Sequence, residues 1–137
     1  MTTSLRHRIA FQVLFFIYVA MVLYLCFGHF ENIHSVPRTI LGFPSDKVVH
    51  FCMFFPFPIL AFLAFDQLTE TVPQTLCFAG ITLVVGLLLA LGTEWGQARL
   101  THYRMGDRQD FLADSLALLL STAIVIFWDI RKQKKKK

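Results

Sequence analysis

Four long apolar segments constrain this chain more than any other feature of its sequence. They cover residues 9–27, 48–65, 76–93 and 111–128, each about 18 residues long, and a membrane-spanning helix needs about 20 apolar residues. None of them alternates polar and apolar residues, so helices rather than barrel strands are expected to satisfy their backbone in lipid. The sequence predicts an all-α fold: a single domain, residues 1–137, forming an integral membrane bundle of four transmembrane helices.

The composition supports a membrane protein. Hydrophobic residues make up 55% of the chain and charged residues 16%, whereas a soluble domain has about 25% charged residues. The positive charge is concentrated in the tail 131–137, directly after the last apolar segment. A basic tail at this place is typical of contact with anionic lipid. We therefore expect a lipid bilayer as partner and no nucleic acid.

The basic residues also predict an orientation, because cytoplasmic segments carry an excess of Lys and Arg. Of the thirteen Lys and Arg residues, eight precede the first apolar segment or follow the last one: Arg6, Arg8, Arg131, Lys132 and Lys134 to Lys137. The other five fall in the two connections that would then face outward, and the connection 66–75 has none. Both termini are therefore predicted to be cytoplasmic.

Polar residues gather where the second helix begins, the third ends and the fourth begins. With four helices these three places lie at the same outward depth, so topology alone predicts one shared site. Its ligand-binding candidates are Asp46, Lys47, His50, Glu94, Gln97, Arg104 and Asp110, and its candidates for acid–base catalysis are His50, Glu94, Asp110 and Asp114. Ionisable residues within membrane helices usually face the bundle interior and serve a function.

Helical spacing refines this prediction. Asp46 and His50 are four residues apart, as are Asp110 and Asp114, so each pair shares one helix face. Small residues continue the two faces inward, Gly86 and Ala90 from Glu94, and Ala117 and Ser121 from Asp114. Such residues let membrane helices approach closely. We expect the third and fourth helices to pack along this seam.

Structural interpretations remain open for the same residues. Ser45 or Asp46 could serve only as the N-cap of the second helix, and His50 only as a hydrogen-bond partner between helices. Asp114 fits a purely structural role least, because it lies a turn inside an apolar segment. No Cys/His spacing typical of a metal site occurs, so no metal ligands and no cofactor are predicted, although the acids and His50 could hold a divalent cation in an enzyme.

Two short motifs resemble those of the VanZ-like family of bacterial membrane proteins. The first is the D-K-x-x-H sequence Asp46-Lys47-Val48-Val49-His50, at the start of an aromatic apolar helix. The second is an E-x-x-Q…R-x-x-x-x-x-D pattern made by Glu94, Gln97, Arg104 and Asp110. The family usually has Asn where Asp114 stands and glycines where Ala117 and Ser121 stand.

The resemblance implies a bacterial inner membrane and a role in the cell envelope. The family takes its name from a protein associated with resistance to the glycopeptide teicoplanin, so antibiotic resistance is implied only at family level. The leading hypothesis is an outward-facing site that binds or processes a cell-envelope amphiphile, a lipid-linked wall precursor or a phospholipid headgroup. The alternatives are a structural or partner-binding protein, a membrane hydrolase or transferase, and a transporter. The ligand and the oligomeric state stay open.

Overall fold

The structure is a computed structural model that describes residues 4–28, 37–102 and 107–135. Its elements follow the chain in this order: α1 (Leu5–Phe27), β1 (Thr39–Ile40), β2 (Phe43–Pro44), α2 (Ser45–Phe54), α3 (Pro56–Ala64), the 3₁₀ helix η1 (Asp66–Leu68), α4 (Val72–Leu100) and α5 (Arg108–Lys134). The only strands in the described ranges are β1 and β2. They pair antiparallel across Leu41 and Gly42, which both have positive φ, as expected of a two-residue hairpin turn.

Four helical spans are long and apolar enough to cross a membrane: α1, α2 with α3, α4 and α5. The predicted all-α bundle of four helices is therefore confirmed, and the chain has the character of a multi-pass membrane protein. The second span is interrupted at Phe55, and Pro56 occupies the first turn of α3. Because proline has no backbone N–H, Pro56 cannot continue the hydrogen bonds of α2. Proline is nevertheless accepted in the first turn of a helix, so α3 begins at once and the span continues.

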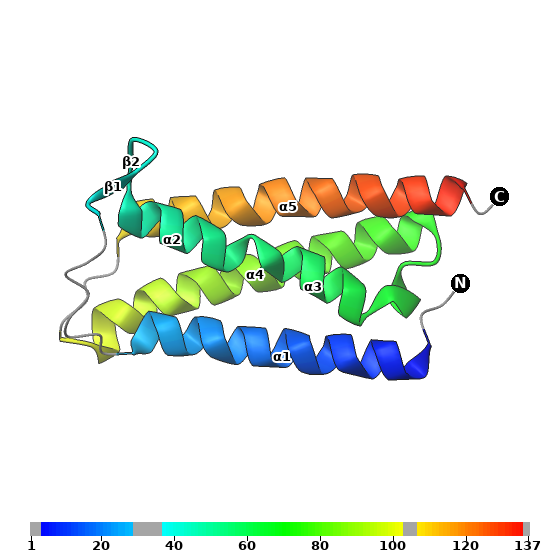
Figure 1. Ribbon diagram of the computed structural model, residues 1–137, viewed down its shortest axis with the longest axis horizontal. Helices are drawn as coiled ribbons and strands as arrows, with labels where there is room; N and C mark the ends of the chain where they lie inside the picture. The colour runs from blue at the N-terminus through cyan, green and yellow to red at the C-terminus, as the bar shows by residue number, and fades with distance from the viewer. Residues whose placement is uncertain (1–3, 29–36, 103–106, 136–137) are drawn as a thin grey trace.

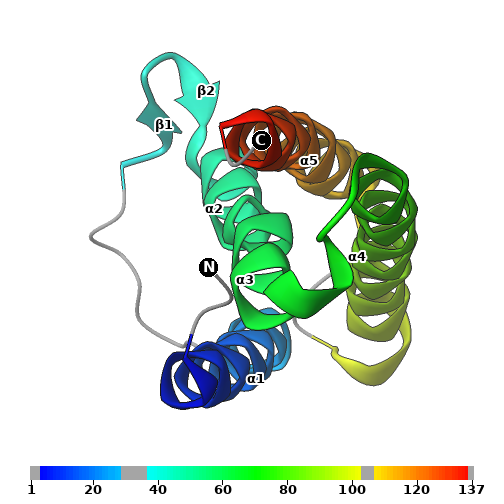
Figure 2. The ribbon, with the colours of Figure 1, turned by 90° about the vertical axis from the view of Figure 1, so that its right-hand side faces the viewer.

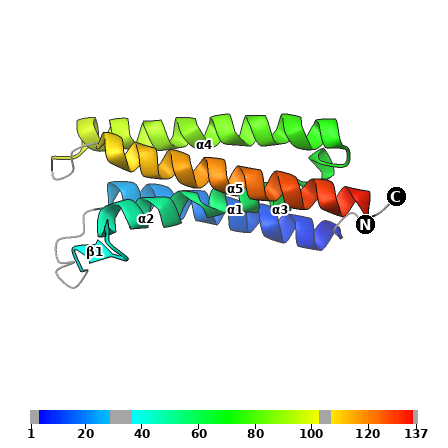
Figure 3. The same cartoon turned by 90° about the horizontal axis from the view of Figure 1, so that it is seen from above.

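The helices run alongside one another as an elongated bundle (Figure 1). Viewed along its length, α3 lies between α1 and α5, and α4 lies beside α5 and also contacts α1 and α3 (Figure 2). The first residue of α1 and the last residue of α5 lie at one end, here called the terminal end. The opposite end, called the distal end, contains the last residue of α1, the first of α2, the last of α4 and the first of α5 (Figure 3).

The helix pair α4 and α5 packs along the predicted seam of small residues. Gly86 and Ala90 of α4 are buried, as are Ala117 and Ser121 of α5. A Cβ at Gly86 would lie 2.7 Å from Leu118 of α5. The close approach therefore depends on the missing side chain, as in other membrane helix pairs.

Large apolar side chains cover the outside of the bundle. Phe16 of α1, Leu88 of α4 and Phe127 of α5 are each more than 60% exposed. Soluble monomers rarely expose extensive apolar surface, whereas lipid tails accept it. The acidic side chains buried between the helices, by contrast, lie toward the two ends: Glu94, Asp110, Asp114 and Asp129.

Candidate functional site

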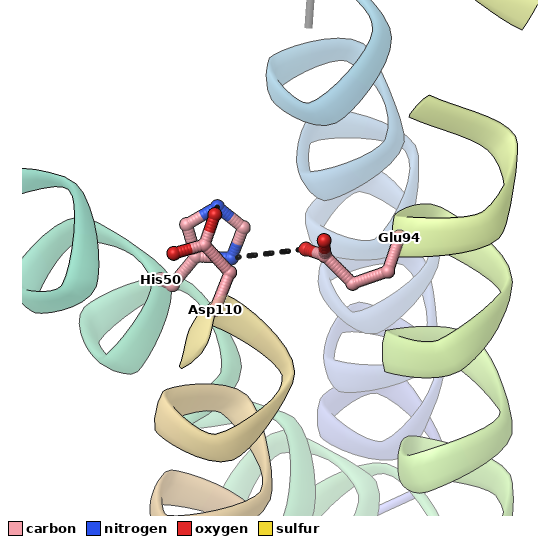
Figure 4. Close-up of side chains that lie close together, drawn as sticks. All are labelled: His50, Glu94 and Asp110. Atoms are coloured by element: carbon pink, nitrogen blue, oxygen red, sulfur yellow. Dashed lines mark ion pairs between the residues drawn. The ribbon is translucent and has the colours of Figure 1, made fainter. Parts of the chain in front are cut away.

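Seven ionisable side chains meet at the distal end and are here called the distal cluster: Asp46, Lys47, His50, Glu94, Asp107, Asp110 and Asp114. They come from α2, α4 and α5, together with the residue just before α5. Figure 4 shows His50, Glu94 and Asp110 pointing toward one another from three helices. The antiparallel order of the spans brings these helix ends to the same depth, as the sequence predicted.

The innermost part of the distal cluster is a histidine–aspartate pair. Nδ1 of His50 lies 3.1 Å from Oδ1 and 3.4 Å from Oδ2 of Asp114. Asp114 is fully buried and His50 is 7% exposed. An Asp beside one ring nitrogen fixes the imidazole tautomer and leaves the other nitrogen for a further partner.

Two more carboxylates face the same imidazole. Nε2 of His50 lies 3.5 Å from Oδ2 of Asp110, and Nδ1 lies 3.8 Å from Oε1 of Glu94. The other Glu94 oxygen, Oε2, accepts a 2.8 Å hydrogen bond from the backbone N–H of Asp107. Oε1 of Glu94 is buried and accepts no hydrogen bond from any residue that the structure describes.

Lys47 links three carboxylates at the outer side of the distal cluster. Its Nζ donates to Asp46 at 2.9 Å, to Asp107 at 2.7 Å, and also to Oδ1 of Asp110. The side chain of Lys47 is 15% exposed, whereas that of Asp46 is 60% exposed. The Lys47 ammonium holds the pKa of the Asp107 carboxyl below its ordinary value. The lysine therefore connects α2 to the start of α5.

Asp107 also begins α5. Its Oδ1 accepts a 2.9 Å hydrogen bond from the backbone N–H of Gln109, as an N-cap residue does. Asp110 lies in the first turn of α5, where a carboxylate is stabilised by the helix dipole. The two acids are thus part of the helix start and of the cluster at once.

The structure brings together most of the residues that the sequence singled out. Asp46, Lys47, His50, Glu94, Asp110 and Asp114 all belong to the distal cluster. Gln97 is buried, but its Nε2 donates to the carbonyl of Cys26 at 2.8 Å. That bond joins α4 to α1. Arg104 lies outside the described residues.

Two expectations about helix ends need correction. Glu94 and Gln97 were expected after the end of the third helix, but α4 continues to Leu100 and contains both. The reading of Ser45 or Asp46 as an N-cap is also wrong, because α2 begins at Ser45 and no side chain caps it. The apolar pattern marks the part of a helix in lipid, whereas the hydrogen-bonded helix extends into polar sequence.

Sequence reasoning missed a second polar group, at the terminal end. Oγ1 of Thr75 donates to Oδ2 of Asp129 at 2.6 Å, and Nε2 of Gln133 donates to the same oxygen at 3.0 Å. Asp129 is 6% exposed. The four-residue spacing of Asp129 and Gln133 was a usable signal, but Thr75 lies on another helix and no pattern pointed to it.

The distal cluster offers acid–base chemistry, whereas the hydroxyls of Ser115 and Ser121 are bonded to the backbone of their own helix, α5. Ser115 donates its hydroxyl to the carbonyl of Phe111, and Ser121 to that of Ala117, both at 2.7 Å. The imidazole of His50 with its flanking carboxylates can accept and donate a proton. The same nitrogen and oxygen atoms are also of the kinds that hold divalent metal ions.

Comparison of the chain with protein-family models, with characterised proteins and with solved structures gives no match. The site must therefore be interpreted from its own geometry.

Proposed function

We propose that the distal cluster is the headgroup site for a cell-envelope amphiphile, either a lipid-linked wall precursor or a phospholipid. The observation that carries this proposal is the buried pair of His50 and Asp114, with Glu94 and Asp110 beside it, at one end of a lipid-exposed helix bundle. Ionisable groups within a membrane bundle are costly and are usually kept for function. An amphiphile resting among the helices presents its headgroup at this depth.

The charge of the cluster favours certain contacts. Within the described part of the cluster, five carboxylates face only two groups that can be positive, Lys47 and His50. Lys47 already pairs with three of the acids, so it is a poor direct partner for a phosphate. Arg108, exposed at the first residue of α5, and Arg104 are the proposed contacts for anionic groups. The acids would meet hydroxyl, amine or amide groups of the headgroup.

His50 is the proposed proton carrier if the site also processes the amphiphile. Asp114 would orient the ring, and Glu94 or Asp110 would exchange the proton with the ligand, as in general acid–base catalysis. A membrane hydrolase or transferase is therefore a natural extension of the binding role. The likeness of the two motifs to the VanZ-like family supports an envelope role in a bacterial inner membrane.

The basic residues around the termini support the proposal that both termini are cytoplasmic. The distal cluster would then face outward, where wall precursors are used. A role in glycopeptide resistance is part of the same proposal and rests on the family resemblance alone.

A structural role for the distal cluster is the second candidate, favoured by the contacts of Lys47. That side chain bonds Asp46 on its own helix and Asp107 and Asp110 at the start of α5, and such a network could serve only to hold α2 against α5. The two candidates differ in one respect: a purely structural network needs no ligand.

Thermal unfolding of the purified protein in detergent tests the proposal. A polyprenyl-diphosphate-linked wall precursor, phosphatidylethanolamine and phosphatidylglycerol are titrated in turn. We expect one of them to raise the melting temperature of the wild type, and His50→Gln and Asp110→Asn to fold and lose that rise. Asp129→Asn is the matched control, since it alters a buried acid at the terminal end and should keep the rise.

A ligand-independent loss of stability in His50→Gln and Asp110→Asn, with no lipid effect on the wild type, would favour the structural candidate. A lipid effect retained in His50→Gln would show that binding occurs elsewhere. Where a lipid does bind, analysis of its products after incubation separates a binder from an enzyme.

A further inference from the structure

The side chains of His50, Glu94 and Asp110 form a compact set of metal-ligand atoms. One nitrogen or oxygen of each lies within 4.8 Å of the other two, and all three residues are buried. They come from α2, α4 and α5 and point into the same space (Figure 4). The packing of three separate helices therefore holds these possible metal ligands close together.

The separation of His50 and Asp110 matches that of two ligands around a small cation. Ligand atoms lie about 2.0–2.2 Å from Zn²⁺, so neighbouring donors of a tetrahedral site are about 3.4 Å apart. The distance from Nε2 of His50 to Oδ2 of Asp110 is 3.5 Å. Oε1 of Glu94 lies 3.8 Å from the other ring nitrogen, Nδ1, so this carboxylate has to turn toward Nε2 to join Asp110 around one cation.

Glu94 gives an independent sign of a missing partner. Its side chain is 8% exposed, and Oε1 is buried without a hydrogen bond from the described residues. Oε2 is fixed by the N–H of Asp107, and Oε1 is the oxygen that approaches the imidazole of His50 (Figure 4). A buried carboxylate oxygen is costly to leave unpaired, and a cation would satisfy it.

The surroundings have the form expected around a metal-binding histidine. Such a histidine usually donates its second ring N–H to a carboxylate, which fixes its tautomer. Asp114, fully buried, lies 3.1 Å from Nδ1 of His50, leaving Nε2 for a metal. The two oxygens of Asp110 also have different partners, since Oδ1 accepts a hydrogen bond from Lys47 and Oδ2 faces His50.

We propose that His50, Glu94 and Asp110 bind one divalent cation, Zn²⁺ or Mn²⁺, and that Asp114 orients the imidazole. One imidazole with two carboxylates suits these ions, whereas Mg²⁺ prefers oxygen ligands alone in a regular octahedron. The neighbouring acid group of Asp46, Asp107 and Asp110 is a weaker candidate, because Lys47 already neutralises it. The cation site goes beyond the amphiphile role and requires no lipid.

Metal binding to the purified, chelator-treated protein in lipid-free detergent tests the proposal. ZnCl₂ and MnCl₂ are titrated by calorimetry, and bound metal is counted by mass spectrometry. We expect one ion per chain in the wild type, at least a tenfold weaker affinity in Glu94→Gln and Asp110→Asn, and a loss of about 10- to 100-fold in Asp114→Asn. Asp129→Asn, which alters a buried acid at the terminal end, is the control and should bind as the wild type does.

X-ray absorption at the zinc edge of the loaded wild type does not depend on the variants folding. Scattering from one imidazole with oxygen neighbours is the expected result. A sulfur neighbour, a shell of oxygen alone, absence of binding to the wild type, or an unchanged affinity in folded Glu94→Gln would each overturn the proposal. If the protein binds no metal but a lipid still raises its melting temperature, the cation proposal is rejected and the proposed amphiphile role is unaffected.

Discussion

Replacing Lys47 by Met should destabilise the bundle strongly while keeping the length of the side chain. The ammonium of Lys47 bonds Asp46 at 2.9 Å, Asp107 at 2.7 Å, and Asp110. Without it, three neighbouring carboxylates repel one another at the junction of α2 and α5. The Lys47→Met variant thus removes the charge that makes this arrangement of acids tolerable.

The magnitude depends on how far water reaches the pair of Lys47 and Asp110. Breaking a fully buried ion pair costs about 3–5 kcal/mol, whereas exposed pairs contribute about 0–1 kcal/mol. The two side chains are 15% and 13% exposed, close to the buried limit but at the edge of the cluster. We therefore expect a loss of about 2–3 kcal/mol in the free energy of unfolding, between the two limits.

Equilibrium unfolding in mixed micelles, with increasing SDS, measures this loss. The double variant Lys47→Met/Asp110→Asn should recover about 1–2 kcal/mol of it, because the buried carboxylate is then neutral. Lys134→Met is the matched control: Lys134 is exposed at the end of α5, and its loss should stay within about 0.5 kcal/mol.

Two results would refute this reasoning. If Lys47→Met unfolds at the same SDS fraction as Lys134→Met, the bonds of Lys47 contribute nothing to holding α2 against α5. If the double variant is as unstable as the single one, the loss of unfolding free energy comes from the altered stem of residue 47 and not from the Asp110 carboxylate left without its lysine.

Three further changes test other parts of the structure by the same SDS unfolding. Thr75→Val keeps the shape of the side chain but removes the 2.6 Å hydrogen bond to Asp129, and should cost about 0.6–2 kcal/mol; a cost near zero would contradict that bond. Gly86→Ala should be less stable than Gly92→Ala by about 1–3 kcal/mol, since an added Cβ meets Leu118 at 2.7 Å in the first case and open space in the second; equal stability would contradict the close packing. Asp107→Asn should be less stable than the wild type at pH 7, because the lysine ammonium holds the pKa of that carboxyl below its ordinary value. A carboxyl whose pKa is lowered in the folded state stabilises the fold at pH values above its unfolded pKa of about 3.9, and this contribution is lost as the pH falls through the folded pKa. The stabilities of Asp107→Asn and the wild type should therefore converge in acid.

The sequence predicted the fold and the location of the site because both follow from simple constraints. Apolar segments of membrane length without polar–apolar alternation are expected to be helices, and the alternating direction of successive spans brings the starts of α2 and α5 to the end of α4. The convergence of His50, Glu94 and Asp110 needed no knowledge of packing. The seam of Gly86 and Ala117 followed from helical periodicity in the same way.

The individual partners could not be predicted, because they depend on helix rotation and on side-chain conformation. Gln97 shares the helix of Glu94, yet it is turned toward the carbonyl of Cys26 on α1. The backbone N–H of Asp107 donates to Glu94 across 13 residues of sequence, a contact that no sequence spacing predicts. Thr75 and Asp129 are 54 residues apart, and neither sequence spacing nor hydropathy relates them.

Buried acids have different partners at the two ends of the bundle, and this difference supports the proposed position of a ligand. Asp129, at the terminal end, receives hydrogen bonds from the neutral groups of Thr75 and Gln133, which satisfy a carboxylate without adding charge. At the distal end, five carboxylates share one lysine, Lys47, and one imidazole, His50, so the ionised acids outnumber the groups that can carry positive charge. Burial makes that imbalance expensive, so the distal cluster is the place where a cation or a polar headgroup has most to stabilise.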